Sequence, residues 1–469
     1  MPTDSLEKKV LRLCQETFGK VGQLQELVRL SGGANMESWA LRYADRSMVL
    51  RRLPGGSRET VDGDDHLGAI SLAAQAELIE SAGRGGVTVP DVLARLEPRH
   101  GLGEGFIMSR VEGETLPHRI LGQPGFAQAE AQLTRQCARE LARIHALDPA
   151  SVPEELRYLT PLELVREQAA KYQDTGALLP VFDFTLRWLQ ENAPTPTPPA
   201  VLHGDFRMGN LMIDASGITA VLDWELAHLG DPARDLAYLC APSWRFGHYD
   251  KPVGGFDQID ALLQAYREQS GRDIEPARLR YWLVFSTLWW GIVCLVMGEL
   301  WRSGGDRSLE RAVIGRRVSE VETDLLLLFE EILGLGGGNG VSWEPPSEHD
   351  FAGEIDYAEL LTALGEWNRE SVQAVTSGHQ LFESRVAGNA LGIARRHTQW
   401  AGVFDQASRE RLREIGLDHA SLCQALAKGS VGLDDKALWD HLRLSALERM
   451  TIDQPRYAGL QQARQRWCK

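Results

Sequence analysis

The sequence predicts an α+β protein in which a small antiparallel sheet with one helix precedes a mostly helical region and a separate all-α domain. Up to about residue 112, short apolar runs alternate with glycine-containing turns, which is typical of strands. From 113 to 335, apolar residues recur at spacings of three and four, as in helices. Residues 336–350 combine glycines, prolines and polar side chains, which indicates a linker before the last domain, 351–469.

Length, charge and cysteine usage exclude several classes of protein. A chain of 469 residues is too long for one ordinary core, so we expect two or three domains. The formal net charge of −15 argues against nucleic acid as a partner. Six scattered cysteines form no metal-ligand spacing, and the N-terminus lacks the apolar core of a secretory signal. We therefore expect a cytoplasmic protein.

The N-terminal region is predicted to form a sheet of short strands with one helix beside it. Its apolar runs are short and rich in aliphatic residues, and glycines punctuate the region between them. We expect strands at residues 25–33, 38–45, 47–54, 91–96 and 106–111. Residues 66–83 show apolar positions at helical spacing and predict the helix.

Helical periodicity dominates residues 113–335. We expect helices at residues 127–147, 160–172, 182–192, 256–271 and 318–334. Residues 281–298 carry no charge over about the minimum length of a membrane span. This segment is rich in tryptophan, contains Ser286 and Thr287 and is a lone candidate, so we interpret it as a buried core helix and expect no membrane partner.

One polar cluster interrupts the helices. In Val201–Glu225, "VLHGDFRMGNLMIDASGITAVLDWE", short apolar runs enclose Asp205, Asn210 and Asp223. The first run suggests a strand that enters a tight turn, and the two later runs read as a hairpin that brings Asp223 back beside this turn. Two carboxylates and an amide oxygen then converge. Oxygen ligands of this kind suit Mg²⁺, and a further carboxylate can accept a proton from a hydroxyl group.

These residues resemble a known pattern. "HGDFRMGN" followed by "VLDWE" is similar to the HGDxxxxN loop and metal-binding segment of the aminoglycoside phosphotransferase and choline kinase-like family, relatives of the protein kinases. The resemblance implies that Asp205 is the catalytic base, that Asn210 and Asp223 hold Mg²⁺ and that His203 supports the loop. "GDPARDLAYL", with Asp235, resembles the helix start that buttresses the loop. A structural turn is the alternative for an isolated Asp or Asn here.

The resemblance covers about residues 20–335 and implies a bilobal protein-kinase-like fold. Residues 1–112 are then the N-terminal lobe, and residues 113–335 are the helical C-terminal lobe with the catalytic loop. The same resemblance implies ATP and Mg²⁺ as cofactors and transfer of the γ-phosphoryl group to a hydroxyl acceptor.

A lobe of this kind needs a glycine turn over the phosphates, a cation on the third strand and an acidic residue on the helix. Ser31, Gly32 and Gly33 stand at the first turn, where backbone amides can approach phosphate oxygens; an ordinary hairpin turn is the alternative. Arg51 occupies the third-strand position where the family often has lysine, and its planar head changes the geometry of phosphate binding. We expect Glu77 to be its partner; a solvated glutamate on the helix face is the alternative.

"GFIMSRVEGETLP" resembles the hinge between the two lobes. This implies that Ser109 to Val111 present backbone groups to adenine while Met108 packs behind it; Met108 alone would be a core residue. Glu225, two positions after Asp223, is interpreted as a solvent or lobe contact rather than a metal ligand. A structural, hydrogen-bonded role is expected of two further histidines, His145 and His228.

The acceptor has no motif of its own. "GVTVPDVL" and "FIMSRVEGETLP" resemble the branch of the family associated with acyl-CoA dehydrogenases, which implies a hydroxyacyl-CoA as one candidate acceptor. The tail resembles a helical domain of uncharacterised function, most visibly at "FESRVAGNALGIARR". It could cap the acceptor cleft, pair subunits into a homo-oligomer or simply stabilise the fold. One alternative function is a catalytically weak nucleotide-binding or regulatory module, which Arg51 favours. A protein kinase is disfavoured because the HRD and APE motifs are missing.

Overall fold

The computed structural model describes residues 5–19, 21–32, 36–54, 68–335, 340–347 and 353–468. These residues form two compact units. Unit 1 contains the chain up to Thr160 together with Thr195–Phe246 and Asp250–Trp282, and unit 2 contains the rest. The units follow a different division from the predicted domains, because each unit takes helices from the region 113–335. The predicted domain boundaries therefore stay a prediction.

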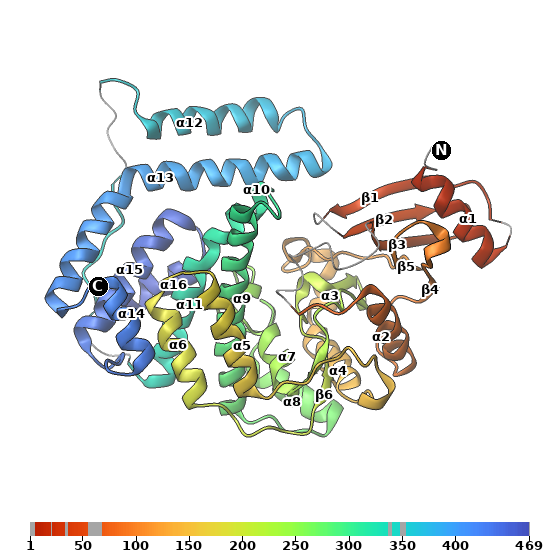
Figure 1. The fold of residues 1–469 in the computed structure, drawn as a ribbon, viewed down its shortest axis with the longest axis horizontal. Helices are drawn as coiled ribbons and strands as arrows, with labels where there is room; N and C mark the ends of the chain where they lie inside the picture. Colours follow the sequence, from red (N-terminus) through yellow and green to blue (C-terminus); the bar gives the residue numbers. More distant parts are fainter. Residues whose placement is uncertain are drawn as a thin grey trace. The chain divides into compact units, whose positions relative to one another are not determined.

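Unit 1 begins with helix α1 (Leu6–Phe18), which was not predicted from the sequence, and continues with an antiparallel sheet of five strands in the order β1-β2-β3-β5-β4 (Figure 1). The strands are β1 (Glu26–Gly32), β2 (Glu37–Arg42), β3 (Ser47–Leu53), β4 (Val92–Arg95) and β5 (Glu104–Ser109). Each predicted strand is present, with ends shifted by a few residues. The predicted α+β class, a small antiparallel sheet followed by a mostly helical chain, is confirmed.

The two faces of the sheet have different roles. Helix α1 (Leu6–Phe18) packs on one face, where Met48 and Leu50 of β3 join a buried apolar cluster. Because successive strand residues point to opposite faces, this register turns Arg51 to the other face. Arg52, on the α1 side, forms an ion pair with Glu37 (2.8 Å). The alternation thus separates a structural arginine from one that can serve a site.

Helix α2 (Leu72–Arg84) lies against β4 and β5. It begins later than the predicted start at residue 66, because the Ser71 hydroxyl caps it by accepting from the Ala74 amide (3.1 Å). The carboxylate of Glu155 in turn accepts from the Ser71 amide and hydroxyl (2.9 and 2.7 Å). These bonds anchor the N-terminus of α2 to the loop that contains Glu155.

The rest of unit 1 combines helices with two short ribbons. Its complete helices after the sheet are α3 (Ala127–Glu130), α4 (Leu133–Ile144), α7 (Pro232–Leu239) and α8 (Ile259–Ser270). Strand β6 (Ala200–Leu202) pairs with β9 (His228–Gly230). Strands β7 (Leu211–Asp214) and β8 (Gly217–Val221) form the predicted hairpin. The two ribbons place the polar cluster in the middle of the unit.

Unit 2 is helical in the described residues. Its helices are α5 (Pro161–Asp174), α6 (Pro180–Glu191), most of α9 (Pro276–Ser303), α10 (Leu309–Ile314), α11 (Val318–Leu333), α12 (Tyr357–Trp367), α13 (Gly378–Ile415), α14 (His419–Lys428), α15 (Lys436–Asp453) and α16 (Ala458–Trp467). Part of the predicted linker is held in place, since the Val341 amide donates to the Trp467 carbonyl (2.7 Å).

Helix α9 contains the uncharged segment 281–298. Among the described residues it is the one helix that is long and apolar enough to cross a membrane, and 78% of its most apolar window is buried inside the protein. That burial agrees with the expected core helix. Gly291 of α9 packs against Phe182, which is fully buried.

Gly291→Ala is expected to lower the free energy of unfolding by about 1–3 kcal/mol through overpacking. A Cβ at this position would lie 2.4 Å from the Phe182 ring and 2.8 Å from Val321. Gly298→Ala, on the same helix, is the matched control. Its nearest contact would be 3.6 Å, so the higher helix propensity of alanine should raise stability by up to about 1 kcal/mol. Urea unfolding measures both, and equal effects would contradict the packing account.

Candidate active site

The predicted catalytic loop begins at a turn that only glycine fits. Gly204 has φ +82°, and a Cβ there would lie 2.1 Å from the Leu226 carbonyl oxygen. The turn carries the chain from β6 into the short helical turn Met208–Asn210. Asp205 therefore follows the strand end within a tightly packed corner, where the residue is 8% exposed.

His203 and Asp235 hold this turn in place through hydrogen bonds. The fully buried Asp235 carboxylate accepts from the backbone amides of His203 (2.8 Å) and Gly204 (3.0 Å). His145 Nε2 lies 3.2 Å from the same carboxylate, and the Tyr266 hydroxyl contacts His145 Nδ1 (2.8 Å). Because a carboxylate only accepts, His145 must donate through Nε2. Asp235 thus holds three donors, in the supporting position that the sequence predicts for it.

Electrostatics fix the protonation of both groups. Burial raises the pKa of Asp235, but the hydrogen bond and charge of His145 outweigh it and hold the pKa at about 2. Burial lowers the pKa of His203 below its ordinary 6.5 despite the nearby carboxylates, so its ring is neutral at pH 7. Its Nδ1 accepts from the Asp205 amide (3.2 Å), and Nε2 donates to the Leu222 carbonyl (2.9 Å).

Asp205 and Asn210 contact each other directly. The Asn210 amide nitrogen donates to the Asp205 backbone carbonyl (2.9 Å) and to its carboxylate. This orientation leaves the amide oxygen of Asn210 for a cation. The other carboxylate oxygen of Asp205 accepts from Arg207 Nε (3.0 Å), whose guanidinium lies over the Trp244 ring, 4.7 Å from its centroid. Sequence reasoning missed Arg207, although a cation two residues after the predicted base was a usable signal.

The β7–β8 hairpin returns Asp223 to this loop. The Leu222 amide donates to the Asn210 carbonyl (2.8 Å), so Asp223 follows a residue bonded to the loop. Asp223 itself has φ +65°, a left-handed conformation that aspartate and asparagine tolerate better than most residues. Backbone strain of this kind concentrates at functional sites. The predicted approach of Asp223 to Asn210 is present.

Arg51 reaches this group from β3. Its Nη2 donates to Asp223 (2.7 Å) and to Glu225 (3.0 Å), and its Nε lies 2.9 Å from the Met36 sulfur. Burial raises the pKa of Asp223, but the Arg51 guanidinium outweighs it and holds the pKa below its ordinary 3.8. Asp223 is therefore ionised at neutral pH. Glu225 proves to be the lobe contact expected from its position, joining the sheet to the hairpin.

The predicted ion pair between Arg51 and Glu77 is wrong in this structure. Glu77 lies on the exposed side of α2, and the carboxylates that contact Arg51 belong to Asp223 and Glu225. Gln75 is the α2 residue that is buried, and its Nε2 donates to the Ile70 carbonyl (3.1 Å). Residues two positions apart in an α-helix point in directions about 200° apart around the helix axis. A helix that buries Gln75 therefore turns Glu77 outward.

The predicted nucleotide contacts are only partly described. Ser31 and Gly32 end β1, opposite Ser38 and Glu37 of β2, whereas Gly33 lies outside the described residues. The strand therefore leads into the predicted phosphate turn.

At the predicted hinge, Met108 lies in β5 and is half-buried. The Ser109 amide donates to the Asp91 carbonyl (2.8 Å), and its hydroxyl accepts from the Asp91 amide (2.9 Å). The Arg110 amide donates to the Ser47 carbonyl (3.1 Å). Strand pairing thus uses the amides of Ser109 and Arg110, and Val111 is the first predicted hinge residue beyond them.

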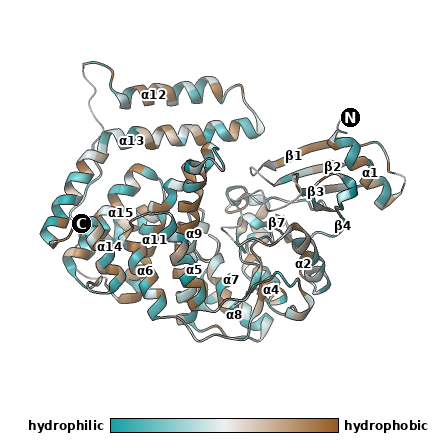
Figure 2. Cartoon of the chain, in the orientation of Figure 1, coloured by the Kyte–Doolittle hydropathy of each residue, from teal (hydrophilic) through white to brown (hydrophobic). Residues whose placement is uncertain are grey.

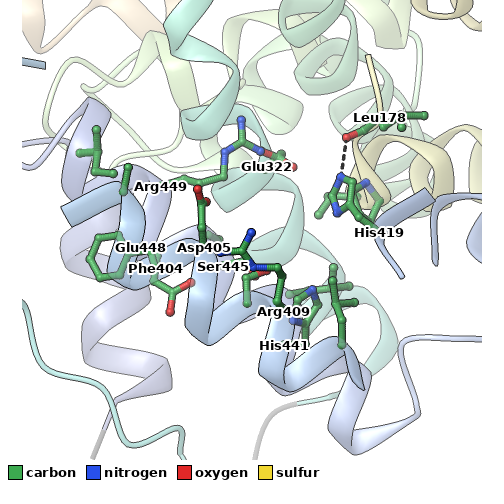
Figure 3. A pocket seen from close by; sticks show the side chains of 18 of the residues that line it. Leu178, Glu322, Phe404, Asp405, Arg409, His419, His441, Ser445, Glu448 and Arg449 are labelled. Carbon is green, nitrogen blue, oxygen red and sulfur yellow. Dashed lines mark hydrogen bonds and ion pairs between the residues drawn. The ribbon is translucent and has the colours of Figure 1, made fainter. Parts of the chain in front are cut away.

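Unit 2 contains a separate cavity of about 470 Å³ between α6, α11, α13, α14 and α15 (Figure 3). None of the predicted site residues lines it. Its buried carboxylates are matched by arginines: Glu322 pairs with Arg449, and Glu448 pairs with Arg411 (2.6 Å). His419 Nε2 contacts the Leu178 carbonyl (3.0 Å). Both of these buried carboxylates therefore have a charged partner within the protein.

The sheet, the catalytic loop and the cation above it define a protein of the phosphotransferase class. The chain belongs to the phosphotransferase enzyme family, whose model matches residues 26–282. A domain of unknown function (DUF6285) matches residues 374–457. The predicted family and the predicted helical tail domain are both confirmed by these matches.

Two mouse relatives illustrate the sequence likeness. Acyl-CoA dehydrogenase family member 10 is 27% identical over 250 residues, 51% of this chain and 22% of that protein. Family member 11 is 32% identical over 202 residues, 39% of this chain and 25% of that protein. The chain thus spans about a quarter of the length of these relatives.

A solved structure shows the same fold. A provisionally assigned aminoglycoside phosphotransferase from Ralstonia eutropha aligns with a TM-score of 0.55 at 21% identity, covering 70% of this chain and 98% of that chain. The predicted bilobal kinase-like fold is confirmed by this likeness.

Asp235→Asn is expected to destabilise unit 1 at pH 7 by on the order of 3 kcal/mol, because an amide cannot accept from all three donors. The folded pKa of Asp235 lies below its unfolded value, so its contribution is present above about pH 4 and is lost as the pH falls towards 2. The difference in unfolding free energy between wild type and variant should therefore shrink from pH 7 to pH 3. A difference independent of pH would contradict this account.

Proposed function

We propose that this protein is an ATP-dependent small-molecule kinase that transfers the γ-phosphoryl group to a hydroxyl acceptor. The observation that carries the proposal is the joining of Asp205, Asn210 and Asp223 in one loop and hairpin, with the Arg51 guanidinium on Asp223. A base, oxygen ligands and a cation are the parts that phosphoryl transfer requires. Membership of the phosphotransferase family supports the same reaction class.

ATP binding is assigned to the sheet side of the site. Arg51 would neutralise phosphate charge, and the turn after Gly32 would bring backbone amides to the phosphates. Val111 would offer its backbone to adenine, since the Ser109 and Arg110 amides serve strand pairing. Glu225 takes the positioning role that the sequence suggested for Glu77, because its carboxylate holds Arg51.

The residues present fit a magnesium ion. Two side chains would supply hard oxygen ligands. They are the amide oxygen of Asn210, whose nitrogen faces Asp205, and the ionised carboxylate of Asp223. Among the described residues, no group of three or more His, Cys, Asp or Glu side chains could hold a metal. Phosphate oxygens and water would complete the shell, as is common for Mg²⁺. When bound, the ion would neutralise charge on the phosphates.

Asp205 acts on the acceptor. Its carboxylate, held by Asn210 and Arg207, orients the incoming hydroxyl and takes its proton. The hydroxyl oxygen forms a bond to the γ-phosphorus while the bond from this phosphorus to the bridging oxygen breaks. ADP leaves with that oxygen, and the product is a phosphomonoester.

A hydroxyacyl-CoA is the acceptor candidate that we favour. Support comes from the relatives named acyl-CoA dehydrogenase family members, which match this chain over a quarter of their length. No described residue identifies the acceptor, so the proposal rests on this likeness and is kept separate from the phosphotransferase reaction itself.

We also propose a cytoplasmic location. All six cysteines are free, and five of them are buried. Free thiols are typical of proteins kept in a reducing compartment.

The second candidate is a catalytically weak nucleotide-binding module. It is favoured by the contact between Arg51 and Asp223, which occupies a proposed metal ligand with a side chain of the protein. Mass spectrometry of a metabolite extract treated with the protein and Mg-ATP separates the two candidates. New phosphomonoesters support the kinase, whereas Mg-ATP binding without transfer to extract or to a panel of alcohols and hydroxyacyl-CoAs supports the module.

Asp205→Asn is expected to lower kcat by about 10²–10⁴-fold because it removes the proton acceptor. Binding of Mg-ATP, measured by calorimetry, should change little. Asp260→Asn, at an exposed position on α8, is the control and should keep full activity. Unchanged turnover in Asp205→Asn would exclude it as the base.

Glu225→Gln is expected to raise the KM for ATP about tenfold, because Arg51 loses a charged partner that holds it in place. Glu77→Gln should leave the KM for ATP unchanged, since Glu77 is exposed. Steady-state kinetics with ATP as the varied substrate compares the two. The reverse order of effects would restore Glu77 as the partner of Arg51.

A further inference from the structure

Helix α12 carries a row of large, exposed apolar side chains beside the face that packs on α13. Tyr357 is 78% exposed, Leu360 50%, Leu364 41% and Trp367 59%. Single exposed apolar residues are ordinary, but four on one helix face form a patch of the kind that marks an interaction site. Figure 2 shows hydrophobic stretches on α12, and its main contacts are with α13 and the turn Asn368–Val372.

The row is separate from the face that packs within the unit. Ala358, 3% exposed, belongs to the side that faces α13. The register of α12 is fixed by a capping box, in which the Asp356 carboxylate accepts from the Glu359 amide (2.8 Å) and the Glu359 carboxylate accepts from the Asp356 amide (2.9 Å). Rotation of α12 to bury the row would expose Ala358, so the packing against α13 opposes it.

The spacing of the row indicates a helical partner. Tyr357, Leu360, Leu364 and Trp367 follow one another at intervals of three, four and three residues. This is the spacing of a two-heptad apolar seam, which packs against another helix. A seam of this length needs a partner helix of similar length.

The same spacing is symmetric about Thr362. Suppose that two copies of α12 run antiparallel, with the two-fold axis between them at the height of Thr362 along the helix. Tyr357 of each copy then meets Trp367 of the other. Leu360 likewise meets Leu364. A two-fold interface requires that residue i contact j while j contacts i, and this row satisfies that condition along its whole length.

Charge agrees with the antiparallel arrangement. Glu354 and Asp356 precede α12, and Arg369 follows it. Arg369 is largely exposed and pairs with its neighbour Glu370 (3.3 Å). An antiparallel copy would place Arg369 beside the acidic residues at the other end, whereas a parallel copy would place Arg369 beside its own equivalent.

The area is sufficient for a dimer. The four residues and Ile355, 74% exposed, present on the order of 600 Å² of surface per copy. A pair would bury about 1,200 Å², which reaches the lower end of specific interfaces. We propose that α12 is a homodimer interface, in which two copies of this chain pair antiparallel about Thr362. The pairing is independent of the proposed phosphotransferase activity.

Light scattering on the full chain tests the proposal over a wide range of concentration. Wild type should be a dimer at high concentration, and Leu360→Glu should raise the dissociation constant by about a hundredfold or more. Val403→Glu, 66% exposed on α13 and outside the row, is the matched control and should remain a dimer. Circular dichroism should show unchanged helix content, because the substituted side chains are exposed. A monomeric wild type, or a dimer that persists in Leu360→Glu, would overturn the proposal.

A charge-swap mixture tests the register. Leu360→Glu and Leu364→Lys should each be monomeric alone, and their mixture should form a heterodimer because position 360 of one copy faces position 364 of the other. Recovery on mixing also shows that both variants are folded. Failure of the mixture to associate would overturn the antiparallel pairing about Thr362.

Discussion

The candidate active site depends on one buried carboxylate. Asp235 has no exposed surface and binds two backbone amides of the turn at His203 and Gly204 as well as the ring of His145. In a protein interior without water, an ionised carboxylate is stable only when hydrogen-bond donors surround it. Removing any of the three donors from Asp235 would therefore cost free energy. The position of Asp205 follows, because it is the next residue in the turn. His203 extends the same support by joining the Asp205 amide to the Leu222 carbonyl.

A second constraint acts from the opposite side of the site. Arg51 bonds to both Asp223 and Glu225, so one guanidinium ties the sheet to the hairpin. In the proposed reaction this contact has to change, since phosphates would compete for Arg51 and a cation would compete for Asp223. Glu225 can keep Arg51 in place during that exchange, because it is not a proposed metal ligand. Until then, the two carboxylates balance the charge of the guanidinium.

In unit 2, buried charges are paired within the protein, whereas part of the apolar surface remains exposed. Around the cavity, buried carboxylates have arginine partners, which makes the charges structural. On α12, by contrast, apolar side chains remain exposed, although another face of the same helix is buried. The first arrangement stabilises the unit internally, whereas the second leaves surface that association can bury.

The sequence by itself determined the α+β class, the strands of the sheet, the β7–β8 hairpin and the approach of Asp223 to the loop of Asp205. These features depend on local periodicity and on turn residues such as Gly204, which a sequence displays directly. Tertiary structure alone decided the partner of Arg51 and the support from His145. The packing of Gln75 turned Glu77 to the surface, and the hairpin brought Glu225 to a strand that lies 174 residues earlier. Such contacts depend on helix rotation and on the relative placement of distant segments, which periodicity within one segment does not specify.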